Sequence, residues 1–270
     1  MAAPDPAKLS LNTATVRKQW KLPQIIEGCA RHDIRGISPW RDQVAEFGLE
    51  QTARLIRTHG LTVTGLCRGG FFTSPNWLED NRRAIAEAHV LGAQCLVLVV
   101  GGLLPESKDL HSSRQRIKEA IATILPEARQ AGVPLAIEPL HPMQAADRAC
   151  INTLEQALDL CDALGEGLGV AVDAYHVWWD PKLEQQIGRA GKKRLLAYHI
   201  CDWLVPTRDL LNDRGMMGDG VIDLPRMRSW VEGAGYAGFH EVEIFSELDW
   251  WKKDPDHVLA TCKQRHREAS

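Results

Sequence analysis

The chain has 270 residues, of which 44% are hydrophobic, and its formal net charge is −3 at pH 7. This size allows one large α/β domain with a substantial core, and the charge balance gives no basic surface for nucleic acid. No apolar run is long enough to cross a bilayer. From the charge balance and the lack of such a run, we expect neither a nucleic acid nor a membrane as partner.

The start of the chain is rich in Ala, Pro and Asp and lacks the basic and apolar segments of a secretion signal. We therefore predict a flexible tail over residues 1–8 and a single domain over residues 9–270. The seven cysteines are scattered, and none forms a Cys-x-x-Cys pair. Reduced thiols of this kind indicate a cytoplasmic protein.

Strand-like and helix-like segments alternate along the chain, and glycines follow several of the helical patterns. The expected elements are, in order, a strand at 9–16, a helix at 22–32, a strand at 34–37, a helix at 49–59, a strand at 61–66, a helix at 77–91, a strand at 94–100, a helix at 112–130, a strand at 134–137, a helix at 154–164, a strand at 169–172, a helix at 182–190, a strand at 195–198, a helix at 224–234 and a strand at 239–242.

About eight strand–helix pairs imply parallel strands with right-handed crossovers, and eight such units close into a (β/α)8 TIM barrel. An α/β open sheet of the doubly wound type is the alternative. That sheet usually carries a Gly-rich turn after its first strand, whereas Arg17-Lys18-Gln19-Trp20 stands there in this chain.

Acidic or imidazole side chains directly follow four of the apolar runs, namely Glu138, Asp173, His199 and Glu243. Each alone could be a helix cap, an ion-pair partner or a core histidine. Together they fall at the carboxyl ends of strands, where a barrel has its active site, and buried groups of this type are costly unless paired or bound. The set predicts one divalent metal ion. Glu241 shares a strand face with Glu243, and spacing does not separate the two.

Two further polar residues lie near these ends. His176 follows Asp173 by three positions and could bind the metal or a substrate oxygen. Arg214 lies on an unusually long connection, 203–221, and is a candidate clamp for a substrate hydroxyl or carboxylate.

Several of the nine tryptophans lie just past the predicted ligand strands. Indole faces stack on the C–H faces of sugars, so Trp178 and Trp203 are candidates for a carbohydrate platform. Trp250 and Trp251 are expected in the core or at a subunit interface.

This arrangement suits proton transfer next to a carbonyl group. The metal would stabilise an enediolate, one carboxylate would remove the carbon-bound proton, and another group would return it. The expected partner is a small-molecule carbohydrate.

The motifs resemble those of the sugar phosphate isomerase/epimerase superfamily, the xylose isomerase-like group that includes ketose 3-epimerases, hydroxypyruvate isomerase, inosose dehydratase and endonuclease IV. The residues that carry the resemblance are the run Ile137 to Pro142, Val172-Asp173-x-x-His176, His199 followed by Cys201-Asp202, and Gly235-Tyr236-x-Gly238 leading to Glu243.

The resemblance implies one divalent metal ion bound by Glu138, Asp173, His199 and Glu243. It favours Glu243 over Glu241, because a short apolar-aromatic pair follows the last ligand of the family. It makes Glu138 and Glu243 the catalytic acid and base. Mn²⁺ is the ion we expect, with Mg²⁺, Co²⁺ and Zn²⁺ as alternatives.

The resemblance also makes His176 and Arg214 substrate contacts. Gln144 stands where the ketose epimerases carry a further glutamate, so we expect it to bind the substrate's terminal group differently. Endonuclease IV-like members need extra histidines, and this chain has Arg68-Gly69-Gly70, Gly101-Gly102 and Asp213-Arg214-Gly215 at those places. A trinuclear zinc site is therefore not expected.

The leading interpretation is a metal-dependent isomerase or epimerase of a small sugar, keto-sugar or polyol. The alternative is a metal-dependent lyase on the same scaffold, either an inosose- or dehydroshikimate-type dehydratase or a β-eliminating enzyme for 3-keto-glycosides. A barrel that binds without turnover is a third hypothesis, which the intact acid and metal set opposes. No phosphate motif is present, which favours an unphosphorylated substrate, and a homo-oligomer (dimer or tetramer) is expected.

Overall fold

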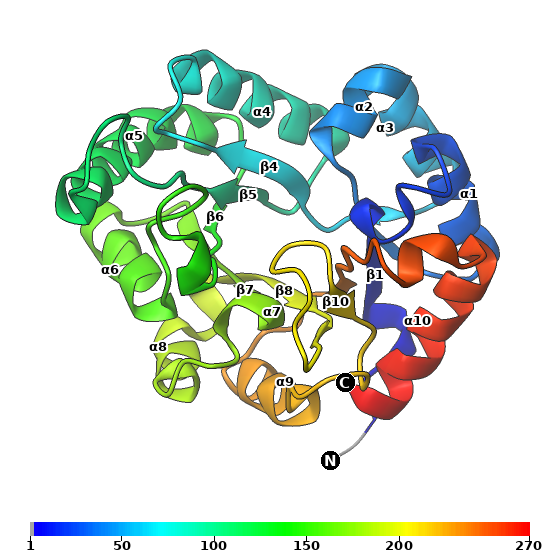
Figure 1. Ribbon diagram of the computed structural model, residues 1–270. Coiled ribbons are helices and arrows are strands. Elements are labelled where there is room, and N and C mark those ends of the chain that lie inside the picture. The colour runs from blue at the N-terminus through cyan, green and yellow to red at the C-terminus, as the bar shows by residue number, and fades with distance from the viewer. Residues whose placement is uncertain (1–2) are drawn as a thin grey trace.

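Nine parallel strands form one curved sheet in the computed structural model, which describes residues 3–270. The strand order is β3-β2-β1-β11-β8-β7-β6-β5-β4. The two outermost strands, β3 (Thr62–Val63) and β4 (Leu66–Gly70), are consecutive parts of one chain segment, so the sheet closes through the backbone. The closed sheet therefore has eight barrel positions with helices around it (Figure 1). The predicted TIM barrel is confirmed, and the open sheet is excluded.

The elements largely follow the predicted order. The other strands are β1 (Leu9–Asn12), β2 (Gly36–Ser38), β5 (Leu96–Val99), β6 (Leu135–Ile137), β7 (Leu168–Asp173), β8 (Leu195–Ile200), β9 (Asp202–Trp203), β10 (Arg214–Gly215) and β11 (His240–Val242). The helices are α1 (Leu22–Arg31), α2 (Arg41–Phe47), α3 (Leu49–Thr58), α4 (Trp77–Leu91), α5 (Leu110–Gln130), α6 (Leu154–Leu164), α7 (Ala174–Val177), α8 (Leu183–Arg194), α9 (Leu224–Gly233) and α10 (Pro255–Ala269).

Several boundaries differ from the sequence-based expectation. The first strand stops at Asn12, whose side chain caps a 3-10 helix over Thr13–Val16. Within the predicted tail, Pro6–Lys8 form a 3-10 helix capped by Asp5. The helix expected at 182–190 continues to Arg194 through a kink.

Four other features were not expected from the sequence. Helices α2, α7 and α10 were missed, and the long connection holds the short antiparallel pair β9–β10. Helix α10 begins at Pro255 and is capped by Asp254. Most of its residues are polar, and only a narrow face of the helix is buried. Its apolar period is therefore weak in the sequence.

Side chains alternate across the barrel wall, as the two-residue period of strands requires. On β8, Tyr198 and Ile200 belong to the main core, while Ala197 belongs to a separate small cluster with Cys67 and Ala136. His199 therefore faces the same side as Ala197, toward the barrel interior. The small residues of this inner cluster leave room for polar side chains inside the barrel.

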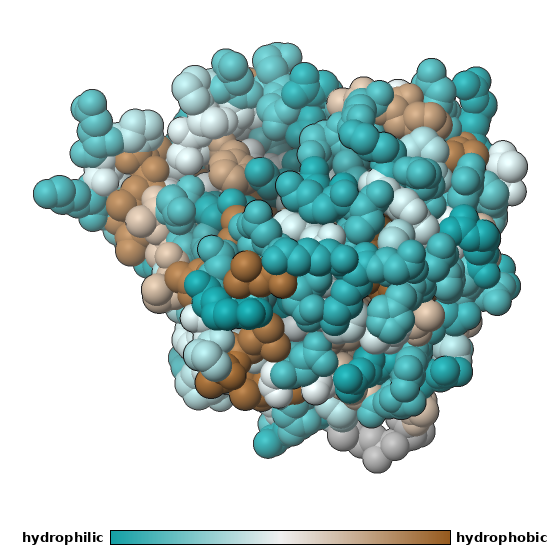
Figure 2. All heavy atoms as spheres, turned by 45° about the vertical axis from the view of Figure 1, so that its right-hand side comes forward, coloured by the Kyte–Doolittle hydropathy of each residue, from teal (hydrophilic) through white to brown (hydrophobic). Residues whose placement is uncertain are grey.

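The surface seen in Figure 2 is mostly hydrophilic, with brown patches gathered on the left part of this face. Among residues 3–270, the large apolar side chains that are at least 46% exposed are Met143, Val205, Val221 and Leu248. Within residues 3–270, no helix is both long enough and apolar enough to cross a membrane. All seven cysteines are free and buried, as the scattered pattern predicts.

Candidate metal centre and substrate cavity

The four predicted ligands meet at the carboxyl ends of neighbouring strands. Glu138 follows β6, Asp173 ends β7, His199 lies near the end of β8, and Glu243 follows β11. One ligand atom from each lies within 4.8 Å of all the others, and all four residues are buried. Three carboxylates and one imidazole form a donor set suited to a divalent cation, so the residues present fit such an ion.

The ring of His199 lies between two carboxylates. Its Nδ1 is 3.0 Å from Oε1 of Glu138, and its Nε2 is 3.5 Å from Oε1 of Glu241. Burial disfavours the charged ring, but the carboxylates outweigh it and raise the pKa of His199 well above its usual value. Nδ1 faces the other ligands, whereas Nε2 faces deeper into the barrel.

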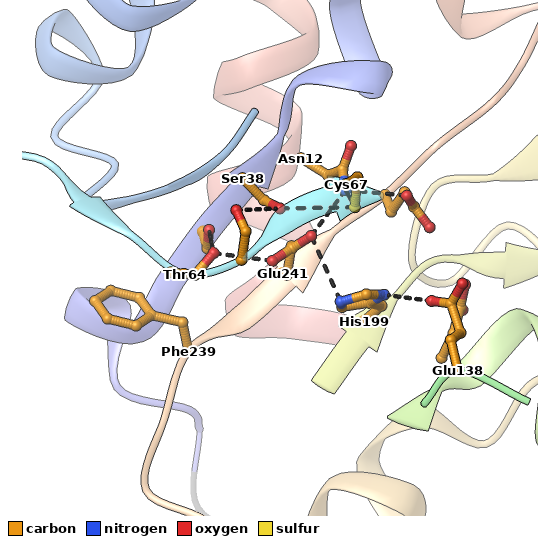
Figure 3. A network of polar contacts seen from close by, with 12 residues as sticks. Asn12, Ser38, Thr64, Cys67, Glu138, His199, Phe239 and Glu241 are labelled. Atoms are coloured by element: carbon orange, nitrogen blue, oxygen red, sulfur yellow. Dashed lines mark hydrogen bonds and ion pairs between the residues drawn. The ribbon is translucent and has the colours of Figure 1, made fainter. Parts of the chain in front are cut away.

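The structure separates Glu241 from Glu243, which spacing alone left open. Both point into the barrel, but only Glu243 belongs to the four-residue cluster. Glu241 lies one layer deeper, where it accepts hydrogen bonds from Asn12 at 2.8 Å and from Thr64 at 2.9 Å. Figure 3 shows its carboxylate between Asn12 and the His199 ring. Glu241 thus lies behind His199, a predicted ligand, on the side away from the other three.

The amide of Asn12 has only one possible orientation. Its Oδ1 accepts hydrogen bonds from Trp40 Nε1 at 2.7 Å and from the backbone N–H of Ala14 at 3.0 Å. Its Nδ2 must therefore donate, and it donates to Glu241 at 2.8 Å and to Glu243 at 2.9 Å. One amide from β1 aligns both carboxylates.

Arg214 inserts its guanidinium group into the cluster. Nη1 donates to Oδ2 of Asp173 at 2.9 Å and to Oε2 of Glu243 at 3.0 Å. Burial acts to raise the pKa of the Asp173 carboxyl, but Arg214, the His176 and His199 rings and the backbone N–H of Tyr175 together outweigh it and hold that pKa below its usual range. Burial raises the pKa of Glu243 to about 8, although the Arg214 charge opposes this shift.

His176 lies beside this arginine. The backbone N–H of His141 donates toward Nδ1 of His176 at 3.2 Å, and Arg214 donates toward its Nε2; a neutral imidazole accepts at only one nitrogen, so only one of these two hydrogen bonds forms at a time. Nε2 lies 3.2 Å from Arg214 Nη2 and 3.7 Å from Oδ2 of Asp173. Burial lowers the pKa of His176 to about 3, so the ring is neutral at physiological pH.

A cavity with about 410 Å³ of empty space, part of it open to solvent, lies above this cluster. The predicted residues that line it are Glu138, His176, Arg214 and Glu243. The side chains that sequence reasoning missed are Trp40, Arg68, Arg148 and Phe245, among others.

The remaining predicted substrate contacts lie elsewhere. Gln144 is buried in a 3-10 helix (Pro142–Gln144), and neither it nor Trp178 and Trp203 lines the cavity. Trp203 stacks instead on His141 with ring centroids 4.9 Å apart and lies 5.8 Å from Trp178. Their roles as substrate contacts stay predictions.

The backbone of the long loop that carries Arg214 is fastened to one buried carboxylate. Asp202 accepts hydrogen bonds from the backbone N–H groups of Trp203, Gly218 and Gly220 at 2.9 Å and of Ile222 at 3.0 Å. This anchoring fixes the ends of the segment around Arg214.

The site residues that sequence reasoning missed differ in whether a sequence pattern could have identified them. Asn12 ends the first strand as the ligands end theirs, so the same strand-end reasoning could have found it. Arg68 lies on strand β4, whereas Trp40 and Arg148 lie outside the named strands and helices, and only the folded barrel brings the three to one cavity.

Comparison with known proteins agrees with this geometry. The family described as xylose isomerase-like TIM barrel matches residues 26–261. An inosose isomerase of Bacillus velezensis is 27% identical in an alignment 279 positions long that covers 95% of each chain. The crystal structure of protein SMc04130 from Sinorhizobium meliloti 1021 is 58% identical, with a TM-score of 0.96 over 98% of this chain and 99% of that one. A crystal structure of IOLI protein with a bound zinc atom has 24% identity and a TM-score of 0.81 over 97% of each chain.

Proposed function

Because the chain belongs to the xylose isomerase-like TIM barrel family, we propose that it is a metal-dependent isomerase or epimerase of a small sugar, keto-sugar or polyol. The observation that carries this proposal is the buried cluster of Glu138, Asp173, His199 and Glu243 beneath an open cavity. Relatives named inosose isomerase support an isomerase on this scaffold.

The four clustered residues would hold one divalent cation. When bound, the cation supplies positive charge that polarises a substrate carbonyl and stabilises the negative charge of an enediolate. Mn²⁺ is the ion we expect, with Mg²⁺, Co²⁺ and Zn²⁺ as alternatives.

The chain's own groups move the proton. Glu138 and Glu243 both line the cavity and supply two carboxylates beside the substrate. One removes the proton from the carbon next to the carbonyl, and the other returns a proton to the adjacent carbon or to the opposite face. Arg214 and neutral His176 contact substrate oxygens and hold the reacting carbon between the two glutamates.

The test is solvent isotope exchange. The metal-loaded protein is incubated with a panel of ketoses in deuterated water and followed by proton NMR. Deuterium entering one carbon without loss of water supports the isomerase. A new unsaturated product would instead support the lyase, whose reaction begins with the same proton removal. The absence of exchange with every ketose in the panel would contradict both the isomerase and the lyase.

The matched variants are Glu138→Gln and Glu247→Gln. Glu247 is an exposed carboxylate outside the site, so its change should leave turnover intact. We expect Glu138→Gln to lose at least about 100-fold in turnover, the usual contribution of acid–base catalysis. Metal content and melting temperature, measured on the same samples, separate loss of the base from loss of the cation or of the fold. Retained turnover in Glu138→Gln would refute its role.

A further inference from the structure

Three arginines line the cavity, and two of them, Arg68 and Arg148, lack the ion pairs that neutralise Arg214. Arg214 is paired with Asp173 and Glu243, whereas Arg68 and Arg148 have no carboxylate oxygen within 4.0 Å in residues 3–270. The Nε of Arg68 is buried and has no hydrogen-bond partner. A buried donor without an acceptor is costly, so a group that supplies acceptors there is favoured.

Aromatic rings hold Arg68 in place. Its guanidinium carbon lies 3.9 Å from the ring centroid of Phe71 and 5.9 Å from that of Trp40. Burial, and then the positive charge of Arg148, lower the pKa of Arg68 to about 10, so it stays charged at neutral pH. Two like charges thus act on each other in one cavity, and an anion between them would relieve that repulsion.

The charge balance of the site leads in the same direction. The buried carboxylates in or directly behind the site are Glu138, Asp173, Glu241 and Glu243. A divalent cation and Arg214 together offset three of these four negative charges. Arg68 and Arg148 then outnumber the one that remains, so the loaded cavity keeps net positive charge.

We propose that Arg68 and Arg148 bind an anionic group, a carboxylate or a phosphate, on the sugar substrate. This inference rests on the proposed function and narrows its substrate class to keto-sugar acids or ketose phosphates, and the lack of a phosphate motif in the sequence favours the acids. Guanidinium groups present paired N–H donors that match both kinds of anion. The metal end of the cavity holds the reacting carbonyl, and the arginine end holds the anion.

The experiment compares three probes that differ in charge: D-fructose, D-fructose 6-phosphate and 5-keto-D-gluconate. Binding to the metal-loaded protein is measured by titration calorimetry, and deuterium exchange is measured separately. We expect at least one anionic probe to bind ten-fold or more tightly than fructose. The phosphate and carboxylate probes show which anion the site prefers.

The variants are Arg68→Met and Arg148→Met, with Arg54→Met as the matched control because Arg54 is exposed on α3. Each cavity variant should weaken binding of the preferred anion at least ten-fold while leaving fructose binding within two-fold. Arg68→Lys should restore part of the loss, since it returns the charge. Melting temperatures show that the variants are folded.

Two results separate this inference from the proposed function. If no probe exchanges deuterium but anion binding still depends on Arg68 and Arg148, the anion site is supported and the isomerase fails. If fructose binds and exchanges as well as the anions, and the Arg68 and Arg148 variants do not differ from the Arg54 control, the anion site is overturned and the isomerase stands.

Discussion

The deepest carboxylate of the site offers a sharp test of how the metal centre is built. Glu241 touches no predicted substrate group, yet its Oε1 lies 3.5 Å from Nε2 of His199. A histidine that binds metal through one nitrogen usually offers its other N–H to such a partner, which fixes the ring and its tautomer. Glu241→Gln should therefore weaken metal binding, although none of the four predicted ligands is itself changed.

The surroundings of Glu241 make the amide a poor substitute. Asn12 and Thr64 both donate to the carboxylate, and the orientation of Asn12 is fixed by its own acceptor. A glutamine would keep its carbonyl oxygen toward Asn12 and turn its NH₂ group toward the Thr64 hydroxyl, which can accept, so what is lost is the negative charge that faces the ring. Loss of an outer partner of a metal-binding histidine typically costs 10- to 100-fold in metal affinity, or about 1.4 to 2.7 kcal/mol.

The assay is the dissociation constant for Mn²⁺ or Zn²⁺, measured by competition with a chelator. Glu247→Gln, an exposed change after the same strand, is the control. The charge of Glu241 also raises the pKa of His199, so its removal alone would reduce proton competition and tighten binding at neutral pH. Affinity equal to or tighter than that of the unchanged protein would therefore refute the positioning role.

Three more outcomes follow from the structure. Burial lowers the pKa of His240 to about 3 and of His266 to about 4. Both rings therefore take up protons more readily when unfolded. The free energy of unfolding is then retained above about pH 6.5 and falls below it, by about 1.4 kcal/mol per pH unit for each imidazole. His176 acts in the same direction, and Glu243, whose pKa is raised, offsets one of these three imidazoles. Urea unfolding at pH 7 and pH 5 checks this, and a flat profile would contradict it. Removing the metal by chelation should lower the melting temperature by roughly 5 °C or more, because the cation binds only the folded site; an unchanged melting curve would argue against a metal centre. Asp202→Asn should cost about 2 kcal/mol, since an amide cannot accept all four backbone hydrogen bonds. Hydrogen exchange at Gly218 and Gly220 should then accelerate, and unchanged protection would show that Asp202 does not anchor the loop.

The alternation of strands and helices predicted the barrel, and the strand-end pattern indicated Glu138, Asp173 and His199 as site residues. Both patterns could be recognised because they depend on local sequence. Strand period and helix caps act over a few residues, so they are readable along the chain. Depth within the barrel is different. Glu241 and Glu243 share one strand face, and only packing against the neighbouring strands shows which of them joins the cluster.

The cavity walls were the least predictable part of the site. The indole rings of Trp178 and Trp203 follow predicted ligand strands as a platform would, yet they pack on each other, and Trp203 also stacks on His141. Arg68 and Arg148 lie 80 positions apart and reach one cavity through the closed barrel. No short-range pattern encodes such a meeting, because one arginine is on a strand and the other on a turn, and only tertiary contacts bring the two together.

The position of Asn12 has a consequence for the order in which the protein folds and takes up metal. Every predicted ligand lies in the second half of the chain, but the amide that aligns two of the carboxylates comes from β1, 229 residues before Glu241. Strand β1 also pairs with both β2 and β11. A half-barrel fragment that begins after α5 would carry all four ligands and still lack this amide. Metal uptake during refolding would thus report the moment at which the two ends of the chain join.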